Sequence, residues 1–230
     1  TELNKRAPAA PAAESGVSSD IEVIVDDNNP IHGVTGCDRY VARAIHGFDP
    51  TNHTPNWMRR RLIRAGMRSI SLAVDVTNYV MLDLGQPMHA YDLDKIEGPI
   101  VVRRAAEGEK LTTLDGKEHD LSVEDLLITD SPDGKRGSRI LGIAGVMGGL
   151  YGEVTADTKN ILLEAAHFDS VSIARSARRH KIPSEASRRF ERGVDTQLQP
   201  AAAQMAAELL TKFGNGEPSG HPTDVNTTMY

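Results

Sequence analysis

Three short segments contain the side chains best suited to chemistry, because each mixes small, polar and glycine residues in a way that core packing does not require. The segments are residues 74–92, 143–149 and 184–195. In the first, Thr77 and Asn78 offer a hydroxyl and an amide, and His89 offers an imidazole after a Gly-Gln-Pro turn. If these groups converge on one cavity, they can hold a water molecule and hydrogen-bond a carbonyl or a sugar hydroxyl. Each group alone is more typical of a helix start or of a structural histidine.

Glu164 interrupts the apolar run 161–166, where a carboxylate is costly unless it has a partner. That partner could be an arginine or a backbone amide of the protein, or it could arrive with a substrate. In the second segment, Gly145 and its glycine neighbours let the backbone approach a ligand closely, because no side chain intervenes. A glycine-rich turn without a ligand is the alternative interpretation. In the third segment, Ser184 offers a hydroxyl and Ala186 a small wall.

Several common kinds of site are excluded by the spacing of these residues. The glycines fit neither a dinucleotide-binding loop nor a P-loop, and no Gly-Lys-Ser/Thr follows them. The histidines lack the paired spacing of a metal site, and no Gly-x-Ser-x-Gly elbow occurs. The sequence therefore predicts neither a metal site nor a serine nucleophile.

Length and composition limit the class of protein. A chain of 230 residues can form one sizeable domain or two small ones, and its 39% hydrophobic and 25% charged content is typical of a soluble globular protein. No run approaches the roughly 18 apolar residues that span a bilayer, and the N-terminus lacks an apolar signal core, so no membrane contact is expected. The single cysteine, Cys37, cannot form an internal disulfide and is expected to be a small apolar filler. These features predict a cytoplasmic protein.

The net charge of -6 argues against a general nucleic-acid coat, but two groups of basic residues depart from it. The first group is Arg59, Arg60, Arg61, Arg64 and Arg68. The second group is Arg175, Arg178, Arg179, Lys181, Arg188, Arg189 and Arg192. Such groups can attract phosphates by counterion release. A solvated helix face with salt bridges is at least as good an interpretation of any single arginine.

Hydrophobic periodicity predicts more strands than helices. Strands are expected at residues 21–25, 39–48, 99–105, 125–130, 139–146 and 160–168. Helices are expected at residues 56–66, 75–85 and 200–213. Asp75 is expected to cap the second helix, Gly85 to end it, and Trp57 to anchor the first helix in the core. Asp-Gly within residues 114–116 predicts a hairpin turn, since this pair readily takes positive φ angles.

Because the strands do not alternate regularly with helices, we expect an α+β fold of mixed, strand-rich sheets with a few short helices. Residues 1–20 are rich in Ala, Pro and Ser without a hydrophobic period, and they are expected to be a linker or disordered arm. Residues 21–213 are expected to form the folded domain. Residues 214–230 resemble a loop and are expected to link to a following domain that this sequence lacks.

Taken together and in this order, the three segments resemble the editing domain of the bacterial phenylalanyl-tRNA synthetase beta subunit. The resemblance extends over residues 21–213 and implies the α+β fold of that domain. Members of this family attach phenylalanine to tRNA in the alpha subunit and clear mistaken tyrosine in the beta subunit. An apolar pocket discriminates against an isostere with one added hydroxyl by only about a hundredfold. A second pocket is therefore needed to remove the tyrosine that the first pocket accepts.

By similarity, five residues match family positions that bind the aminoacyl group. Glu164 matches the position that recognises the para-hydroxyl of tyrosine. Ala144 and Gly145 match the pocket wall, and Ser184 and Ala186 match positions that border the aminoacyl group.

Thr77, Asn78 and His89 match family residues around the ester and the attacking water, so the resemblance implies that they are the catalytic group. The family uses no covalent protein intermediate and no metal at this site. Hydrolysis by a positioned water is therefore expected, with the hydroxyl of the terminal adenosine assisting. His89 and Asn78 would orient groups rather than attack.

The resemblance implies that the chain hydrolyses mischarged Tyr-tRNA(Phe), while the full ligase attaches phenylalanine to tRNA(Phe) with ATP and Mg²⁺. No cofactor is expected in this part of the enzyme. The expected partners are tRNA(Phe) and the alpha subunit, in a heterotetramer of two alpha and two beta subunits, with no membrane. Two alternatives stay open: a non-catalytic module that positions tRNA or packs against other domains, and a free-standing trans-acting deacylase.

Overall fold

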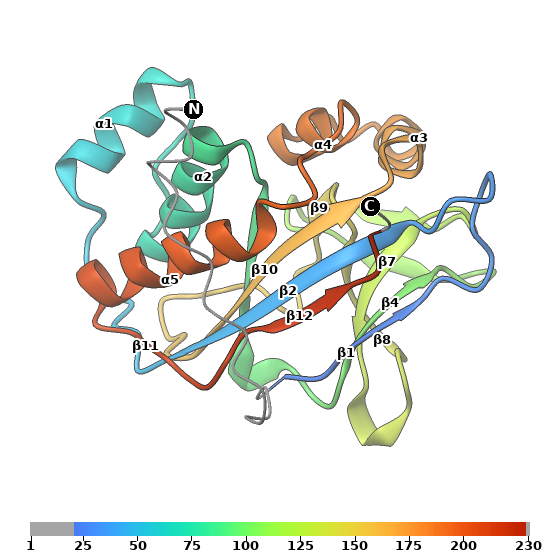
Figure 1. Cartoon of the computed structure of the whole chain (residues 1–230), viewed down its shortest axis with the longest axis horizontal. Helices are drawn as coiled ribbons and strands as arrows, with labels where there is room; N and C mark the ends of the chain where they lie inside the picture. The colour runs from blue at the N-terminus through green and yellow to red at the C-terminus, as the bar shows by residue number, and fades with distance from the viewer. Residues whose placement is uncertain (1–20, 229–230) are drawn as a thin grey trace.

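Two sheets form the centre of the computed structural model, which describes residues 21–228 (Figure 1). The first sheet has the strand order β1 (Val23–Asp26), β4 (Ile100–Arg104), β7 (Leu126–Asp130), β8 (Arg139–Ile143) and β9 (Met147–Gly148). The second sheet has the order β11 (Glu217–Pro218), β2 (Cys37–His46), β10 (Ile161–Phe168) and β3 (Met88–Asp92), and β12 (Thr223–Asn226) also pairs with β2. Among these strands β1 and β4 pair in parallel and the others antiparallel. The predicted α+β fold is confirmed.

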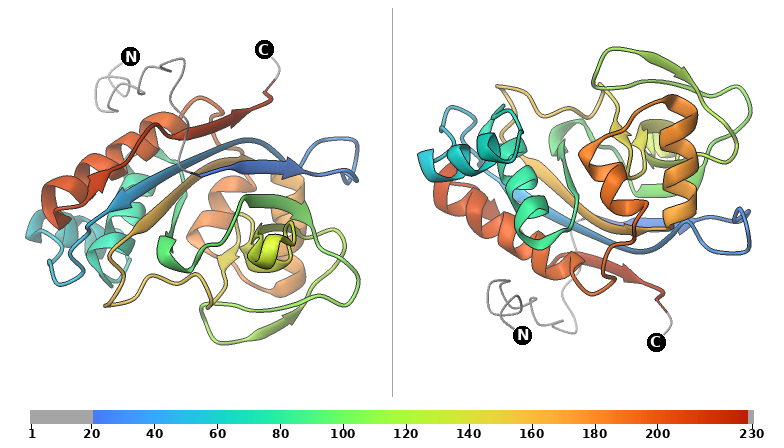
Figure 2. Two further views of the ribbon diagram at one scale, coloured as in Figure 1. Left: turned by 90° about the horizontal axis from the view of Figure 1, so that it is seen from below. Right: turned by 90° about the horizontal axis from the view of Figure 1, so that it is seen from above.

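Three helices cover the second sheet at one end, and two other helices lie toward the first sheet (Figure 2). The covering helices are α1 (Asn56–Arg64), α2 (Leu72–Leu84) and α5 (Gln199–Gly214). The other two are α3 (Ser170–His180) and α4 (Glu185–Phe190). Short 3₁₀ turns occur at Leu93–Lys95 and Pro132–Gly134. None of the described helices is long and apolar enough to cross a bilayer.

The central strand β10 has apolar residues on both faces, so it separates two cores. Ile161 and Leu163 face α1, α2 and α5. Leu162 and Ala166 face the core between the two sheets. Because side chains alternate along a strand, Glu164 shares the face of Leu162 and Ala166 and points into the core between the sheets.

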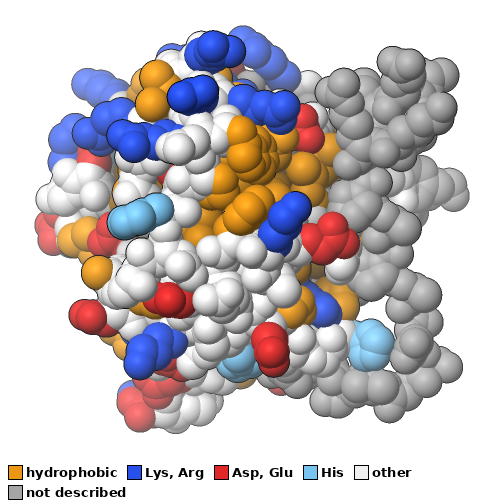
Figure 3. All heavy atoms as spheres, turned by 90° about the vertical axis from the view of Figure 1, so that its left-hand side faces the viewer, with side chains coloured by type: hydrophobic (Ala, Val, Ile, Leu, Met, Phe, Trp, Pro, Cys, Tyr) orange, Lys and Arg blue, Asp and Glu red, His pale blue; other side chains and the backbone are white. Residues whose placement is uncertain are grey.

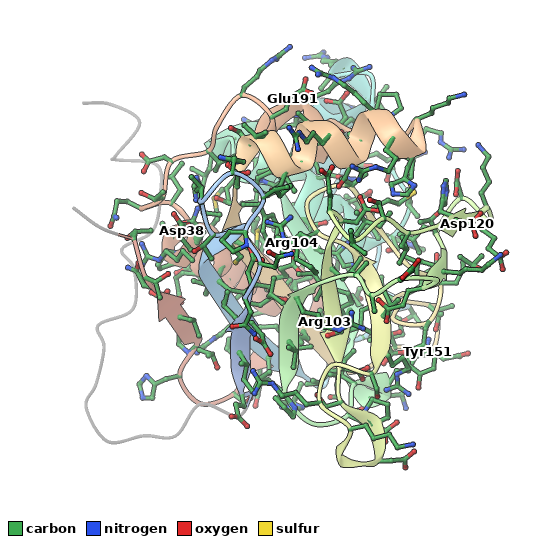
Figure 4. The ribbon with its side chains drawn as sticks, turned by 90° about the vertical axis from the view of Figure 1, so that its right-hand side faces the viewer. Asp38, Arg103, Arg104, Asp120, Tyr151 and Glu191 are labelled. Carbon is green, nitrogen blue, oxygen red and sulfur yellow. The ribbon has the colours of Figure 1, made fainter. Side chains whose placement is uncertain are left out.

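A buried ion pair joins the first sheet to the start of β2 and to α3. Arg104 of β4, labelled in Figure 4, lies beside the loop that follows β1 and pairs with Asp27 at 2.9 Å. A second Asp27 contact fixes that loop, because its carboxylate also accepts from the backbone N–H of Gly36 at 2.6 Å. Arg104 also donates to the hydroxyl of Ser172 at 3.2 Å. Cys37, next along the chain, is free and fully buried, as expected of a small apolar filler.

The first helix is confirmed, but Trp57 is not the core anchor that its size predicts. Met58 and Leu62 are fully buried and, four residues apart, form the stripe that faces the core. Trp57 lies outside that stripe, and 40% of its surface is exposed. It packs edge-on against Tyr79 at 5.1 Å between ring centroids. Ile63 also lies outside that stripe and is 55% exposed.

The second helix ends at Gly85 as predicted, with φ +81°, but Asp75 does not cap it. The cap is Ser71, whose hydroxyl accepts from the backbone N–H of Val74. Asp75 lies one turn further along and is fully buried. It accepts hydrogen bonds from Ile70 N at 2.9 Å, from Thr54 Oγ1 at 2.6 Å and from the hydroxyl of Ser69. The aspartate therefore fixes the chain before the helix rather than the helix terminus.

The ends of the chain differ in how far the structure describes them. The arm expected at residues 1–20 lies outside the described residues. The stretch expected as a linker at 214–230 contributes β11 and β12 to the second sheet through Asn226. The hairpin expected at 114–116 joins β5 (Lys110–Thr112) to β6 (Glu118–Asp120), with Gly116 at φ +78°.

We predict that Asp75→Ala lowers the free energy of unfolding by roughly 2–3 kcal/mol, because it removes a buried charged acceptor from three partly buried hydrogen bonds. Urea denaturation measures this change. Asp83→Ala is the control, since Asp83 is on the same helix but is only half-buried. Equal losses in the two variants would contradict the role given to Asp75.

Candidate functional site

Strand register brings four polar side chains onto one face of the second sheet. Glu164 of β10 pairs with His89 of β3, and its neighbours Leu162 and Ala166 pair with Tyr91 and Tyr40. Opposite residues of antiparallel strands share a face. His89, Tyr91 and Tyr40 therefore all lie on the face of Glu164.

The carboxylate of Glu164 is held by two phenols at one of its oxygens. Oε2 accepts from the Tyr40 hydroxyl at 2.9 Å and from the Tyr91 hydroxyl at 2.8 Å. The residue is 7% exposed. No described residue donates a hydrogen bond to Oε1. One oxygen is thus anchored and the other is left for a donor from outside.

Burial shifts the pKa values of Glu164, Tyr40 and Tyr91. Desolvation raises the pKa of Glu164, and the two tyrosine hydrogen bonds oppose that effect. Burial and the Glu164 charge raise the pKa of Tyr40 and of Tyr91 well above the usual value. Both phenols therefore keep their protons and act as donors.

A small cavity of about 60 Å³ lies against Glu164. By the roughly 10–15 Å³ that one water needs, it has room for several water molecules or a small group. Its lining comes from β3 and the residue before it, from β7, from the end of β8 through β9, and from β10 and α4: Pro87, Met88, His89, Tyr91, Ile128, residues 142–148, Glu164, Ala186 and Phe190. Its walls are mostly apolar, and Glu164 is its acidic group.

The glycines of the β8–β9 turn are required by close packing. Gly145 has φ +65°, and a Cβ there would lie 2.9 Å from Phe190 Cδ2. At Gly148 a Cβ would lie 2.7 Å from His89 Cε1. The backbone can therefore close over the cavity only because Gly145 and Gly148 carry no side chains. Ala144, which precedes Gly145, is 1% exposed.

A larger cleft of about 1050 Å³ adjoins the small cavity, because Met88 and His89 line both. Thr77 and Asn78 line the larger cleft. The Thr77 hydroxyl donates to the carbonyl of Val74 at 2.8 Å, so its proton is engaged within α2 and its oxygen can still accept.

His89 stands at the junction of the two spaces. Desolvation lowers the pKa of its imidazole to about 4, so the ring is neutral at pH 7. It packs edge-on against Tyr91, with centroids 4.4 Å apart. No hydrogen bond from the described residues engages its ring nitrogens. A neutral imidazole with unoccupied nitrogens can hold a water molecule as donor or acceptor.

The eight predicted site residues thus fall into three places. The small cavity is lined by Glu164, His89, Ala144, Gly145 and Ala186. The larger cleft is lined by Thr77 and Asn78, with His89. Ser184 lines neither space, because it caps α4 and accepts from the backbone N–H of Ser187 at 3.0 Å. The functional roles given to all eight stay predictions.

Sequence reasoning missed the residues that support Glu164. Tyr91 could have been found, because it lies two positions after His89 in a strand and so shares its face. Tyr40 could not, because its position depends on the pairing of β2 with β10. The first part of the segment 184–195 forms α4, which was not predicted from the sequence. Phe190 of this helix is packed inward, at 3% exposure.

A family model and curated relatives both match most of this chain. A family model described as the B3/4 domain matches residues 36–215. The chain is 83% identical over 226 residues to the phenylalanine–tRNA ligase beta subunit of Bifidobacterium longum, covering 98% of this chain and 26% of that protein. It is 55% identical over 195 residues to the same subunit of Streptomyces avermitilis, covering 84% and 23%. The chain therefore spans about a quarter of the length of these curated relatives.

Among solved structures, an N-terminal fragment of the phenylalanyl-tRNA synthetase beta subunit from Pyrococcus horikoshii matches with a TM-score of 0.45 and 18% identity. The match covers 70% of this chain and 50% of that one.

We predict that the His89 imidazole titrates near pH 4 in the folded protein, because burial disfavours its charged form. Histidine NMR signals followed against pH measure this midpoint, and His89→Gln assigns the signal by removing it. The unfolded chain binds the proton more readily between pH 6.5 and about 4, so falling pH destabilises the fold across that window. A midpoint at 6.5 would contradict the assignment.

Proposed function

This chain belongs to the B3/4 domain family, and on that premise we propose that its two adjoining cavities form an editing site that hydrolyses mischarged Tyr-tRNA(Phe). The chain would serve as the editing domain of a phenylalanine–tRNA ligase beta subunit, which is the name of the relatives that it matches. The observation that carries this proposal is the carboxylate of Glu164, which is anchored at Oε2 and has no donor among residues 21–228 at Oε1, beside the small cavity.

Selection of tyrosine follows from that unused oxygen. The phenol of a tyrosyl group in the small cavity donates its O–H to Oε1 of Glu164. A phenylalanyl group fills the same space but leaves Oε1 desolvated and unpaired, which costs about 1–3 kcal/mol or more for a charged group. The cavity thus rejects the correct amino acid and retains the incorrect one.

Hydrolysis takes place where the cavities meet. The ester carbonyl lies near His89, and the terminal adenosine occupies the larger cleft beside Thr77 and Asn78. The oxygen of a water molecule forms a bond to the carbonyl carbon, and the bond from that carbon to the ribose oxygen breaks. The water's proton passes to the departing ribose oxygen, with the neighbouring ribose hydroxyl assisting. The products are free tyrosine and tRNA(Phe).

The protein groups position the reactants in this scheme. Neutral His89 accepts from or donates to the attacking water, and the Asn78 amide donates to the ester or to a ribose oxygen. No side chain forms a covalent intermediate. Under this proposal ATP and Mg²⁺ serve the aminoacylation reaction of the full ligase. Its alpha subunit and tRNA(Phe) are the proposed partners, in an assembly of two alpha and two beta subunits.

We predict that Glu164→Ala lowers the preference for Tyr-tRNA(Phe) over Phe-tRNA(Phe) by about 10- to 150-fold, the equivalent of a charged hydrogen bond of about 1.5–3 kcal/mol. Deacylation of both tRNAs, by the chain and by the full ligase, measures the ratio of kcat/KM values. Glu208→Ala, an exposed glutamate of α5, is the control. Unchanged Tyr-tRNA hydrolysis in a folded Glu164→Ala protein would favour a non-catalytic module.

We predict that His89→Ala lowers kcat roughly a hundredfold while KM changes little, because a group that places the water acts on the chemical step. Steady-state deacylation kinetics separate the two constants. His46→Ala, at the exposed end of β2 and outside both cavities, is the control. A rise in KM with kcat unchanged would instead assign His89 to substrate binding.

A further inference from the structure

The arginines of α1 and of the turn after it form an exposed basic surface on a protein of net charge -6. They are Arg59, Arg60, Arg61, Arg64 and Arg68. Helix α1 itself contains no acidic residue. Among the ion pairs of the described residues, none includes these five arginines. In Figure 3, Lys and Arg side chains gather along the top of the face on which α1 lies.

The second basic group is different, because much of its charge is neutralised within the protein. Arg175 and Arg179 of α3 pair with Glu124, at 3.2 Å for Arg175. Arg188 and Arg189 of α4 pair with Glu185 at 3.2 and 2.9 Å. The α1 group therefore keeps more unpaired positive charge than the second basic group does.

The position of the α1 group links it to the larger cleft. Arg59 lines that cleft, together with Thr77, Asn78 and His89. Arg60 and Arg64 are four residues apart and lie on one exposed side of the helix.

Arg61 is engaged differently from its neighbours. It donates to the Tyr79 hydroxyl at 2.7 Å and lies over the Trp57 ring at 5.3 Å. It is therefore a packing residue, and Arg59, Arg60, Arg64 and Arg68 form the available set, named here the α1 arginine track.

Like charges one turn apart destabilise a helix, so an unpaired set of this kind points to a polyanionic ligand. We propose that the α1 arginine track binds the backbone phosphates of the single-stranded 3′ end of a tRNA and leads its terminal nucleoside into the larger cleft. This proposal rests on the proposed function and adds the route by which the ester reaches the site. Guanidinium groups suit phosphates because they present several donors in one plane.

The test measures binding of a labelled, short single-stranded oligoribonucleotide to the purified chain over a salt titration. Arg60→Gln/Arg64→Gln should weaken binding at least about tenfold. It should also reduce the slope of log K against log salt by about 1.4, at about 0.7 for each lost phosphate contact on a single strand. Arg178→Gln/Arg192→Gln removes the same charge from exposed positions of the second basic group and should leave the slope unchanged.

Three results would overturn the proposal. Equal weakening by the two double variants would show a general charge effect rather than a track. Unchanged binding by Arg60→Gln/Arg64→Gln would remove the arginines from the route. Binding of a blunt RNA duplex or of polyglutamate as tight as that of the single strand would mean that a different partner suits this surface.

Hydrolysis of tyrosyl-adenosine by the wild-type chain separates this proposal from the proposed function, because that ester has no phosphate backbone. If the ester is cleaved while Arg60→Gln/Arg64→Gln binds RNA normally, the track is wrong and the hydrolytic site stands. If RNA binding depends on the track but neither tyrosyl-adenosine nor Tyr-tRNA is cleaved, the proposed hydrolysis is wrong instead.

Discussion

The structure depends on one buried carboxylate and the two phenols that hold it. Glu164 lies in a strand with apolar neighbours on both faces, where an unpaired charge would cost several kcal/mol. Tyr40 and Tyr91 donate to it from the strands on either side, so β2, β10 and β3 must be adjacent and in one register. A slip of one residue would move the carboxylate to the core beneath α2 and α5, where neither phenol could reach it.

The same carboxylate has one anchored oxygen and one that accepts no hydrogen bond from the part of the chain that the structure describes, and this difference gives the small cavity its chemical character. If both oxygens were satisfied by the protein, Glu164 would be a structural residue only. The cavity is closed by a turn whose glycines cannot carry side chains, since Gly145 and Gly148 lie against Phe190 and His89. Packing and polarity are therefore coupled, because the turn that positions the wall also holds the His89 ring.

His89 connects the two spaces physically and electrostatically. Its ring is buried enough to remain neutral, yet it borders the large cleft that is open to a bulky ligand. In the function that we propose, recognition of the amino acid and cleavage of the ester are assigned to opposite sides of this residue. Under that proposal, the carboxylate discriminates side chains while water reaches the ester from the other side.

The sequence alone determined six of the strands (β1, β2, β4, β7, β8 and β10), most ends of the three predicted helices and the family resemblance, because these depend on local periodicity, turn residues and ordered motifs. The strand β3, the tail strands, α3 and α4 were not foreseen, since these segments gain stability from pairing and packing with distant elements. Trp57 was predicted to be buried because of its size, but burial also depends on which side of the helix a residue lies. The partners of Glu164 also required the tertiary structure: Tyr40 is 124 positions away in the chain, and only strand pairing brings its hydroxyl to the carboxylate.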